Sequence, residues 1–190
     1  MRGTGPLLAP FTIRRCASVD AVPISALAAR LFVQAYGVEY AGPELESYLV
    51  KSFDAERFAE QMFDGENVFA LAVESSTGEQ IGYALMSASL EVPHSVTEEH
   101  SLEIQRFYVD SAWHGKGVAQ SLMRACIARA EQWGADAIWL SVWQEAPRPQ
   151  TFYTRMGFGI VGTTAFHFGT RVDDDYVMVL PLNRVSPTAG

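Results

Sequence analysis

The chain has 190 residues, of which 48% are hydrophobic, 12% aromatic and 19% charged, and its net charge is −8. This length and composition predict one globular domain, which we place at residues 11–182, between a flexible N-terminus (1–10) and a flexible tail (183–190). The acidic balance, without a basic stripe along the sequence, argues against a nucleic-acid binder and mildly favours cationic small substrates.

The chain opens with a predicted strand and helix. Residues 11–16 are strand-like, and the helix that follows has Pro23 in its opening turn and ends at Gly37. The spacing of its apolar residues predicts an inner face made of Leu27, Leu31 and Ala35.

A second helical stretch and a hairpin come next. Residues 43–62 predict a helix that breaks near 52–54, where a polar cap restarts it. Residues 68–73 and 81–87 are strand-like and are joined by a glycine-containing loop, so we expect them to pair antiparallel.

The central stretch combines a strand, a glycine turn and a long helix. Residues 102–109 are rich in β-branched and aromatic side chains, which predicts a strand. After the turn 114–119, apolar residues recur at the spacing of one helical face: Val118, Leu122, Cys126 and Ala130. Glycines at a helix N-terminus present free backbone amides to an anion, so a phosphate-bearing ligand is the first hypothesis.

The last third of the chain predicts a crossover and a closing hairpin. Residues 137–142 are expected to lie parallel to 102–109, because a helix intervenes. We predict a short helix at 149–156, and strands at 159–168 and 176–182 around the turn 169–175. The acidic run Asp173-Asp174-Asp175 is interpreted as the solvated tip of this hairpin, and binding of an amine by the run is the less favoured alternative.

Three segments in a fixed order carry a family resemblance. They are Phe107-Tyr108-Val109, then His114-Gly115-Lys116-Gly117-Val118-Ala119, and later Phe152-Tyr153-Thr154-Arg155-Met156-Gly157-Phe158. Together they resemble the GNAT superfamily of acyl-CoA-dependent N-acyltransferases, over the whole order of elements from residue 11 to 182. Residues 48–57 and 166–178 are loosely similar to polyamine-type N-acetyltransferases. A dinucleotide fold is disfavoured because Gln120 stands where its third glycine would be.

The resemblance implies an α/β (α+β) fold with one mixed, mostly antiparallel, twisted sheet flanked by helices. Its two parallel strands splay apart to bind coenzyme A, and acetyl-CoA is the implied cosubstrate. The pantetheine arm would lie along Phe107, Tyr108 and Val109. The pyrophosphate would lie on the backbone amides of the turn, which runs through His114, Gly115, Lys116, Gly117, Val118 and Ala119. A solvated side chain is preferred for Lys116.

The implied activity is transfer of an acetyl group to a primary amine, a polyamine or another small amine, by direct attack in a ternary complex. Tyr153 is the candidate general acid for the coenzyme thiolate, and anchoring of the last helix is its alternative role. Glu103 is the candidate base, acting directly or through water, and a surface-facing carboxylate is an equal alternative. Because side chains alternate along a strand, we expect Glu103, Gln105 and Phe107 to share a face.

Two positions depart from the family pattern. His114 replaces the usual Gln or Arg at the first position of the turn, which would make its phosphate contact weaker and pH-dependent. Ala146 replaces an Asn that often contacts coenzyme A. These departures keep a second function open, a catalytically silent CoA-binding regulatory or interaction module.

The remaining features predict no metal, disulfide or membrane span. Cys16 and Cys126 are far apart, and Cys126 falls on a buried helical stripe. The histidines lack metal-ligand spacing, so no metal is expected. The sequence shows neither a signal peptide nor about 18 consecutive uncharged apolar residues, so we expect a cytoplasmic protein without membrane partners. The acceptor amine and a homodimer are left open.

Overall fold

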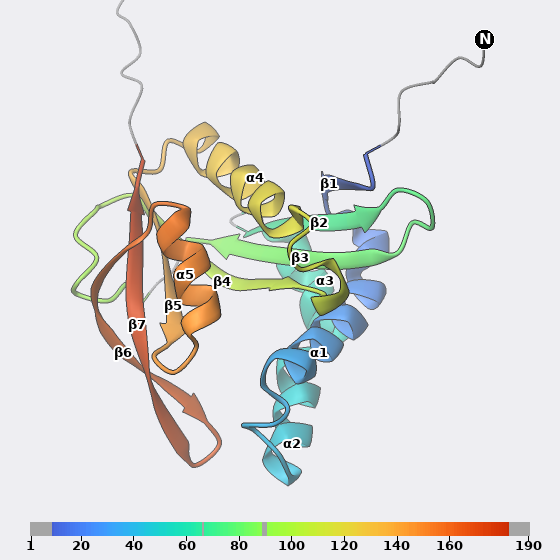
Figure 1. Cartoon of the computed structure of the whole chain (residues 1–190), viewed down its shortest axis with the longest axis horizontal. Coiled ribbons are helices and arrows are strands. Elements are labelled where there is room, and N and C mark those ends of the chain that lie inside the picture. Colours follow the sequence, from blue (N-terminus) through green and yellow to red (C-terminus); the bar gives the residue numbers. More distant parts are fainter. Residues whose placement is uncertain (1–8, 66, 89–90, 183–190) are drawn as a thin grey trace, which may run out of the picture.

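The computed structural model describes residues 9–65, 67–88 and 91–182, so most of the predicted flexible N-terminus and the whole predicted tail lie outside the described residues. One sheet of seven strands has the order β1-β2-β3-β4-β5-β7-β6 (Figure 1). The strands are β1 (Phe11–Arg15), β2 (Asn67–Glu74), β3 (Gln80–Ser87), β4 (Ser101–Val109), β5 (Ala137–Trp143), β6 (Gly159–Phe168) and β7 (Arg171–Pro181).

Helices flank this sheet, and α3 passes behind β3 and β4 while α5 lies in front of the strands in Figure 1. The α-helices are α1 (Ala21–Tyr36), α2 (Pro43–Ser52), α3 (Ala55–Phe63), α4 (Val118–Gln132) and α5 (Pro147–Arg155); short 3₁₀ turns are η1 (Ser18–Asp20) and η2 (Ser111–Trp113). Strands β4 and β5 pair parallel, and the other neighbours pair antiparallel. The predicted fold class is therefore confirmed.

Two hydrophobic clusters cover the two faces of the sheet. The predicted stripe of α4 is confirmed, because Val118, Leu122, Cys126 and Ala130 are all buried. On the opposite face α1 contributes a wider stripe than predicted, consisting of Ile24, Leu27, Ala28, Leu31 and Phe32. Ala35 is exposed, so its assignment to the inner face was wrong; the ring of Tyr36 packs against the cluster at the end of this helix.

Helix α1 is apolar because it is a core helix. With the preceding turn it forms a segment, Ser18–Tyr36, that has the length and mean hydropathy (1.2) to cross a membrane, and it is 44% buried. Asp20 and Arg30 interrupt the segment with charges. The buried stripe against β2 and β3 supplies part of this hydropathy, and the exposed residues Val19, Val22 and Val33 add to it.

The break predicted between the second and third helices is confirmed and has a defined cap. Asp54 accepts hydrogen bonds from the backbone amides of Glu56 and Arg57, at 3.0 and 3.1 Å. These bonds satisfy two of the free N–H groups at the start of α3. Phe58, in the next turn, is fully buried.

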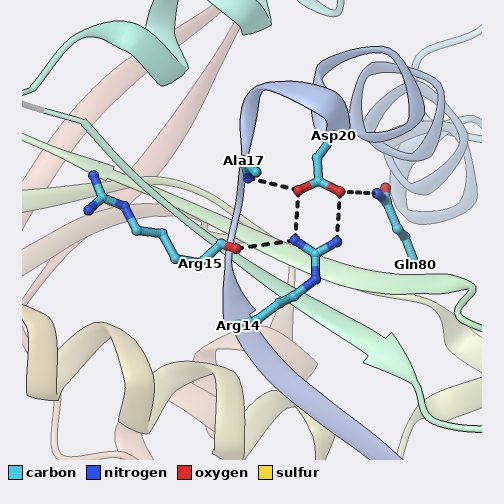
Figure 2. Close-up of polar contacts among 5 residues, drawn as sticks. All are labelled: Arg14, Arg15, Ala17, Asp20 and Gln80. Atoms are coloured by element: carbon cyan, nitrogen blue, oxygen red, sulfur yellow. Dashed lines mark hydrogen bonds and ion pairs between the residues drawn. The ribbon is translucent and has the colours of Figure 1, made fainter.

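A charged network joins the start of α1 to the sheet (Figure 2). The buried carboxylate of Asp20 accepts hydrogen bonds from both terminal nitrogens of Arg14, at 2.6 and 2.7 Å. It also accepts from the amide of Ala17 at 2.8 Å and from Gln80 at 3.2 Å. The guanidinium of Arg14 and these hydrogen bonds hold the pKa of Asp20 below its usual value. One carboxylate therefore ties β1, β3 and the start of α1 together.

Two predicted boundaries were wrong near the C-terminus. Helix α5 begins at Pro147, two residues earlier than predicted, because proline is well accommodated in a first helical turn. Strand β7 begins at Arg171, so the hairpin turn is only Gly169-Thr170. The run Asp173-Asp174-Asp175 is not a solvated tip: it pairs with Phe166, Ala165 and Thr164 of β6. Pairing within the sheet overrides the low strand preference of Asp.

Candidate active site

The site lies where β4 and β5 separate. Only three residue pairs join these parallel strands, from Ser101↔Ala137 to Glu103↔Trp139. Both strands continue beyond that point, β4 to Val109 and β5 to Trp143, and Figure 1 shows them diverging. The backbone groups that face the gap are left without a strand partner across it, and such groups can hydrogen-bond an extended ligand.

A β-bulge at Gln105 determines which side chains of β4 point to each face of the sheet. The pairing with β3 passes from Leu85↔Arg106 to Met86↔Ile104, so Gln105 is an extra residue. Beyond the bulge the alternation is reversed: Phe107 packs with Ile104, whereas Arg106 lines the same cavity as Glu103. The expectation that Glu103 and Phe107 share a face was wrong, because strict alternation ignores the inserted residue.

The glycine turn has the backbone geometry of an anion cradle at the start of α4. Gly115 and Gly117 have φ values of +77° and +85°, which favour glycine, and Gly117 is the N-cap. The first intrahelical bond runs from the amide of Ser121 to the carbonyl of Gly117. The amides of the first helical turn therefore have no acceptor within the helix, and they can receive a phosphate. Val118 is fully buried, so only its main chain can take part.

The side chains of the turn are held by the protein itself. Nε2 of His114 lies 2.8 Å from the carbonyl oxygen of Val109, and because that oxygen accepts, this nitrogen carries the proton. The imidazole thus fastens the turn to the end of β4. Lys116 is exposed, and its ammonium lies 4.8 Å from the centroid of the Trp113 ring, a cation–π geometry.

Helix α1 supports the cradle from the other side. Arg30 forms an ion pair with Asp110, the residue after β4, and Asp110 also accepts from the amide of Ala112 at 2.9 Å. The amide of Ser111 donates to Gln34 at 2.9 Å. The start of the connection between β4 and α4 is therefore anchored by side chains far away in sequence.

Tyr153 lies in an aromatic cluster on the α4–α5 side of the gap. Its side chain is buried and makes edge contacts with Phe107, Phe152 and Phe158, with ring centroids 5.4 to 6.2 Å apart. Burial raises the pKa of Tyr153 above its usual value, with smaller contributions from Tyr36 and Cys126. The phenol therefore keeps its proton across the physiological pH range, as a proton donor requires.

Gln150, which the sequence analysis did not single out, stabilises the connection between β5 and α5. Ala146 caps α5 without a side-chain hydrogen bond. Instead, Nε2 of Gln150 donates to the carbonyls of Trp143 and Gln144, at 2.8 and 2.9 Å. This pair of bonds fixes α5, and with it Tyr153, relative to the end of β5.

A cavity of about 300 Å³ opens on the α1–α3 side of the gap. Its wall is mainly aromatic: Phe32, Tyr36, Tyr40, Tyr48, Phe53, Tyr108, Trp143 and Phe166. Five polar residues complete the wall: Glu103, Gln105, Arg106, Ser141 and Asp175. A concave cavity into which several polar groups converge is typical of a small-molecule site.

Asp175 is the residue of this cavity that the sequence most clearly missed. Its side chain is only 6% exposed, and Oδ1 has no hydrogen-bond partner within the described part of the chain. Burial raises the pKa of Asp175 to about 6; a hydrogen bond from Ser141 opposes the rise, and the charges of Asp173 and Asp174 add to it. Such an environment is typical of a carboxylate that acts on a ligand.

The tip of the β6–β7 hairpin is fastened to the segment between α1 and α2. The hydroxyl of Tyr40 donates to Asp173 at 2.7 Å, and Arg171 pairs with the same carboxylate at 2.7 Å. The hydroxyl of Thr170 donates to Glu44 at 3.1 Å. Because Tyr40 also lines the cavity, these contacts close one side of it.

The structure places the predicted residues on two sides of one gap. Glu103 lines the aromatic cavity, whereas Tyr153 belongs to the cluster on the opposite face of the sheet, in contact with Phe107. The glycine cradle lies beyond the end of β4. Within residues 9–65, 67–88 and 91–182, no group of three His, Cys, Asp or Glu side chains is arranged to hold a metal ion.

Comparison with known proteins agrees with this architecture. The model of the acetyltransferase (GNAT) family matches residues 32–158. An uncharacterized N-acetyltransferase of Mycobacterium tuberculosis (strain ATCC 25618 / H37Rv) is 33% identical over 163 residues, which are 86% of this chain and 98% of that protein.

Two solved structures share the fold. The PaiA N-acetyltransferase from Thermoplasma acidophilum, in complex with coenzyme A, has a TM-score of 0.74 at 16% identity, covering 90% of this chain and 99% of that one. The spermidine/spermine N-acetyltransferase SpeG from Vibrio cholerae has a TM-score of 0.64 at 17% identity, covering 90% and 94% of the two chains.

Proposed function

The chain belongs to the acetyltransferase (GNAT) family, and on this premise we propose that it transfers the acetyl group of acetyl-CoA to a small primary amine by direct attack in a ternary complex. The observation that carries the proposal is the gap between β4 and β5, which has an anion cradle at one end and an aromatic, carboxylate-bearing cavity on one face. The donor and the acceptor can then approach the same backbone from different directions.

The donor side uses mainly the backbone. The amides of Gly115, Gly117, Val118 and Ala119 hold the pyrophosphate of coenzyme A, and the main chain of Phe107 to Val109 binds the pantetheine arm. A free amide near the bulge stabilises the negative charge that develops on the thioester oxygen. The PaiA complex supports the choice of donor, because a protein of this fold binds coenzyme A.

The acceptor side supplies the amine and removes its proton. The amine enters through the aromatic cavity, and Glu103 receives its proton directly or through water. Tyr153 returns a proton to the departing thiolate from the other face of the sheet. Holding both reactants in one gap supplies much of the rate enhancement. A polyamine was favoured on sequence, and SpeG acts on spermidine and spermine, although the shared fold alone does not specify the acceptor.

The test is release of free thiol from acetyl-CoA in the presence of a panel of primary amines. We expect release that depends on the amine, and a kcat about 100-fold lower for Tyr153→Phe, the lower end of general acid–base contributions. Tyr176→Phe removes a different phenol packed against the same cluster and serves as the control. Full turnover by Tyr153→Phe would refute the acid role. Coenzyme A binding without amine-dependent release would favour the silent module.

A further inference from the structure

Three charged residues line the aromatic cavity, and two of them, of opposite sign, each have a buried atom without a partner in the described part of the chain. Oδ1 of Asp175 and Nη1 of Arg106 are both shielded from solvent and lack hydrogen-bond partners among the described residues. Both residues line the cavity. A buried charged group with an unsatisfied atom lowers the stability of the fold. Two such groups in one cavity therefore indicate a site whose ligand supplies the missing partners.

Arg106 is held in place by aromatic rings and not by an acid. Its guanidinium carbon lies 4.6 Å from the ring centroid of Phe53 and 5.3 Å from that of Phe58. No ion pair joins it to any carboxylate of the described residues, even though the chain carries 22 acidic residues against 14 basic ones. The phenol of Tyr83 is a further hydrogen-bonding neighbour of the guanidinium. Cation–π contacts orient the guanidinium, and Nη1 is left without a partner among the described residues.

Asp175 lies on a different element, in β7 opposite Trp143 of β5. Its neighbour in the wall is the hydroxyl of Ser141, from the part of β5 that has already separated from β4. The carboxylate is therefore at the gap itself, where the amine must react. Charged groups that served only stability would form an ion pair, but among the described residues no ion pair joins Asp175 to Arg106, although both line this cavity.

Arg106 and Asp175 bring opposite charges into one cavity, and Glu103 adds a second carboxylate to the same wall. A ligand that carries one charge of each sign satisfies both Asp175 and Arg106, whereas a polyamine carries only positive charges and leaves Arg106 without a counter-charge. The aromatic wall suits a flat or bulky apolar body. The volume of about 300 Å³ is at the lower end of ligand sites, so the ligand is small.

We infer that the acceptor is a zwitterionic amino acid with an aromatic or bulky apolar side chain, whose ammonium group faces Asp175 and whose carboxylate pairs with Arg106. This inference rests on the proposed acetyl transfer and narrows its acceptor. Asp175 then binds the ammonium next to Glu103, and Arg106 fixes the carboxylate, so that only one orientation presents the nitrogen to the thioester.

The first experiment compares phenylalanine with phenethylamine, which has the same ring and amine but no carboxylate, and with spermidine. Tryptophan and leucine extend the amino-acid arm. We expect kcat/KM to be at least about 10-fold higher for phenylalanine than for phenethylamine, because a site built for a polar group discriminates strongly against an analogue that lacks it. Spermidine should be the poorest acceptor.

The second experiment assigns this preference to Arg106. In Arg106→Met the ratio of kcat/KM for phenylalanine to that for phenethylamine should fall to about 1, and Arg106→Lys should give an intermediate ratio, since lysine keeps the charge but loses the forked geometry. Arg15→Met, an exposed site on β1, is the control and should leave the ratio unchanged. Urea unfolding confirms that each variant is folded.

The third experiment assigns the ammonium subsite. Asp175→Asn should raise KM at least about 10-fold for both phenylalanine and phenethylamine, because both present the same ammonium group. Asp174→Asn, at the exposed neighbouring position, should not change KM.

The outcomes separate the two levels of the proposal. Equal or better acetylation of phenethylamine or spermidine would overturn the zwitterion inference and leave the acetyl transfer intact. An unchanged ratio in Arg106→Met would overturn the role of Arg106. If no amine in the panel accelerates thiol release, the proposed function fails and the inference fails with it.

Discussion

Asp175→Asn should make the protein more stable while it weakens the site. The carboxylate is only 6% exposed, and burial raises its pKa from 3.8 to about 6. A carboxyl group whose pKa rises on folding binds its proton more tightly in the folded state. Its contribution to stability is therefore fully present below pH 3.8 and is lost as the pH rises through about 6. Asparagine keeps the shape of the side chain and has no charge to bury.

The size of the effect follows from the two pKa values. Their difference, at about 1.4 kcal/mol for each pH unit, gives about 3 kcal/mol of destabilisation by the ionised carboxylate at pH 8. At pH 4 most of this cost is absent, so the free energy of unfolding of Asp175→Asn relative to the natural chain should increase by roughly 2 kcal/mol from pH 4 to pH 8. For a chain of this length, that corresponds to a rise in relative Tm of about 5 °C.

The assay is urea unfolding of the natural chain and of Asp175→Asn at several pH values from 4 to 8. Other titrating groups are common to both proteins and cancel in the difference. Asp174→Asn is the control, because its carboxylate is exposed and its replacement should give a curve parallel to that of the natural chain. Parallel curves for Asp175→Asn would refute the reasoning, since they would mean that folding does not perturb this carboxyl group.

Three further outcomes are expected. Gly117→Ala places a side chain at φ +85° and should lower the free energy of unfolding, measured by urea unfolding, by about 1 kcal/mol. It should also weaken coenzyme A binding, measured by calorimetry. An unchanged affinity would contradict the role of the cradle. Asp20→Asn should lower the free energy of unfolding by about 1–3 kcal/mol at pH 7. Because Arg14 lowers the pKa of Asp20, this difference should shrink as the pH falls below about 4. A difference that stays constant with pH in urea unfolding would contradict the prediction. Glu103→Gln should lower kcat about 100-fold and remove the acidic limb of its pH profile; an unchanged profile would exclude the base.

The sequence by itself determined most of the elements and the position of the glycine turn. Regular periodicity placed the strand at residues 102–109 and the helix stripe from Val118 to Ala130, and both lie where predicted. Gly115 and Gly117 marked the cradle because only glycine readily adopts their positive φ values. These features depend on residues that are close together in the chain, so the sequence alone is enough to predict them.

The cavity that we propose for the acceptor was decided by tertiary structure. Asp175 looked like part of a solvated turn, and it becomes a buried cavity residue because β7 pairs with strands on both sides. Arg106 faces the cavity only because the bulge at Gln105 reverses the alternation along β4. Both effects depend on partner strands distant in the chain, and neither leaves a periodic signal in the sequence. The glycine turn that we propose for the donor is thus encoded in a local motif, whereas the cavity that we propose for the acceptor is formed by side chains that meet only in the folded sheet.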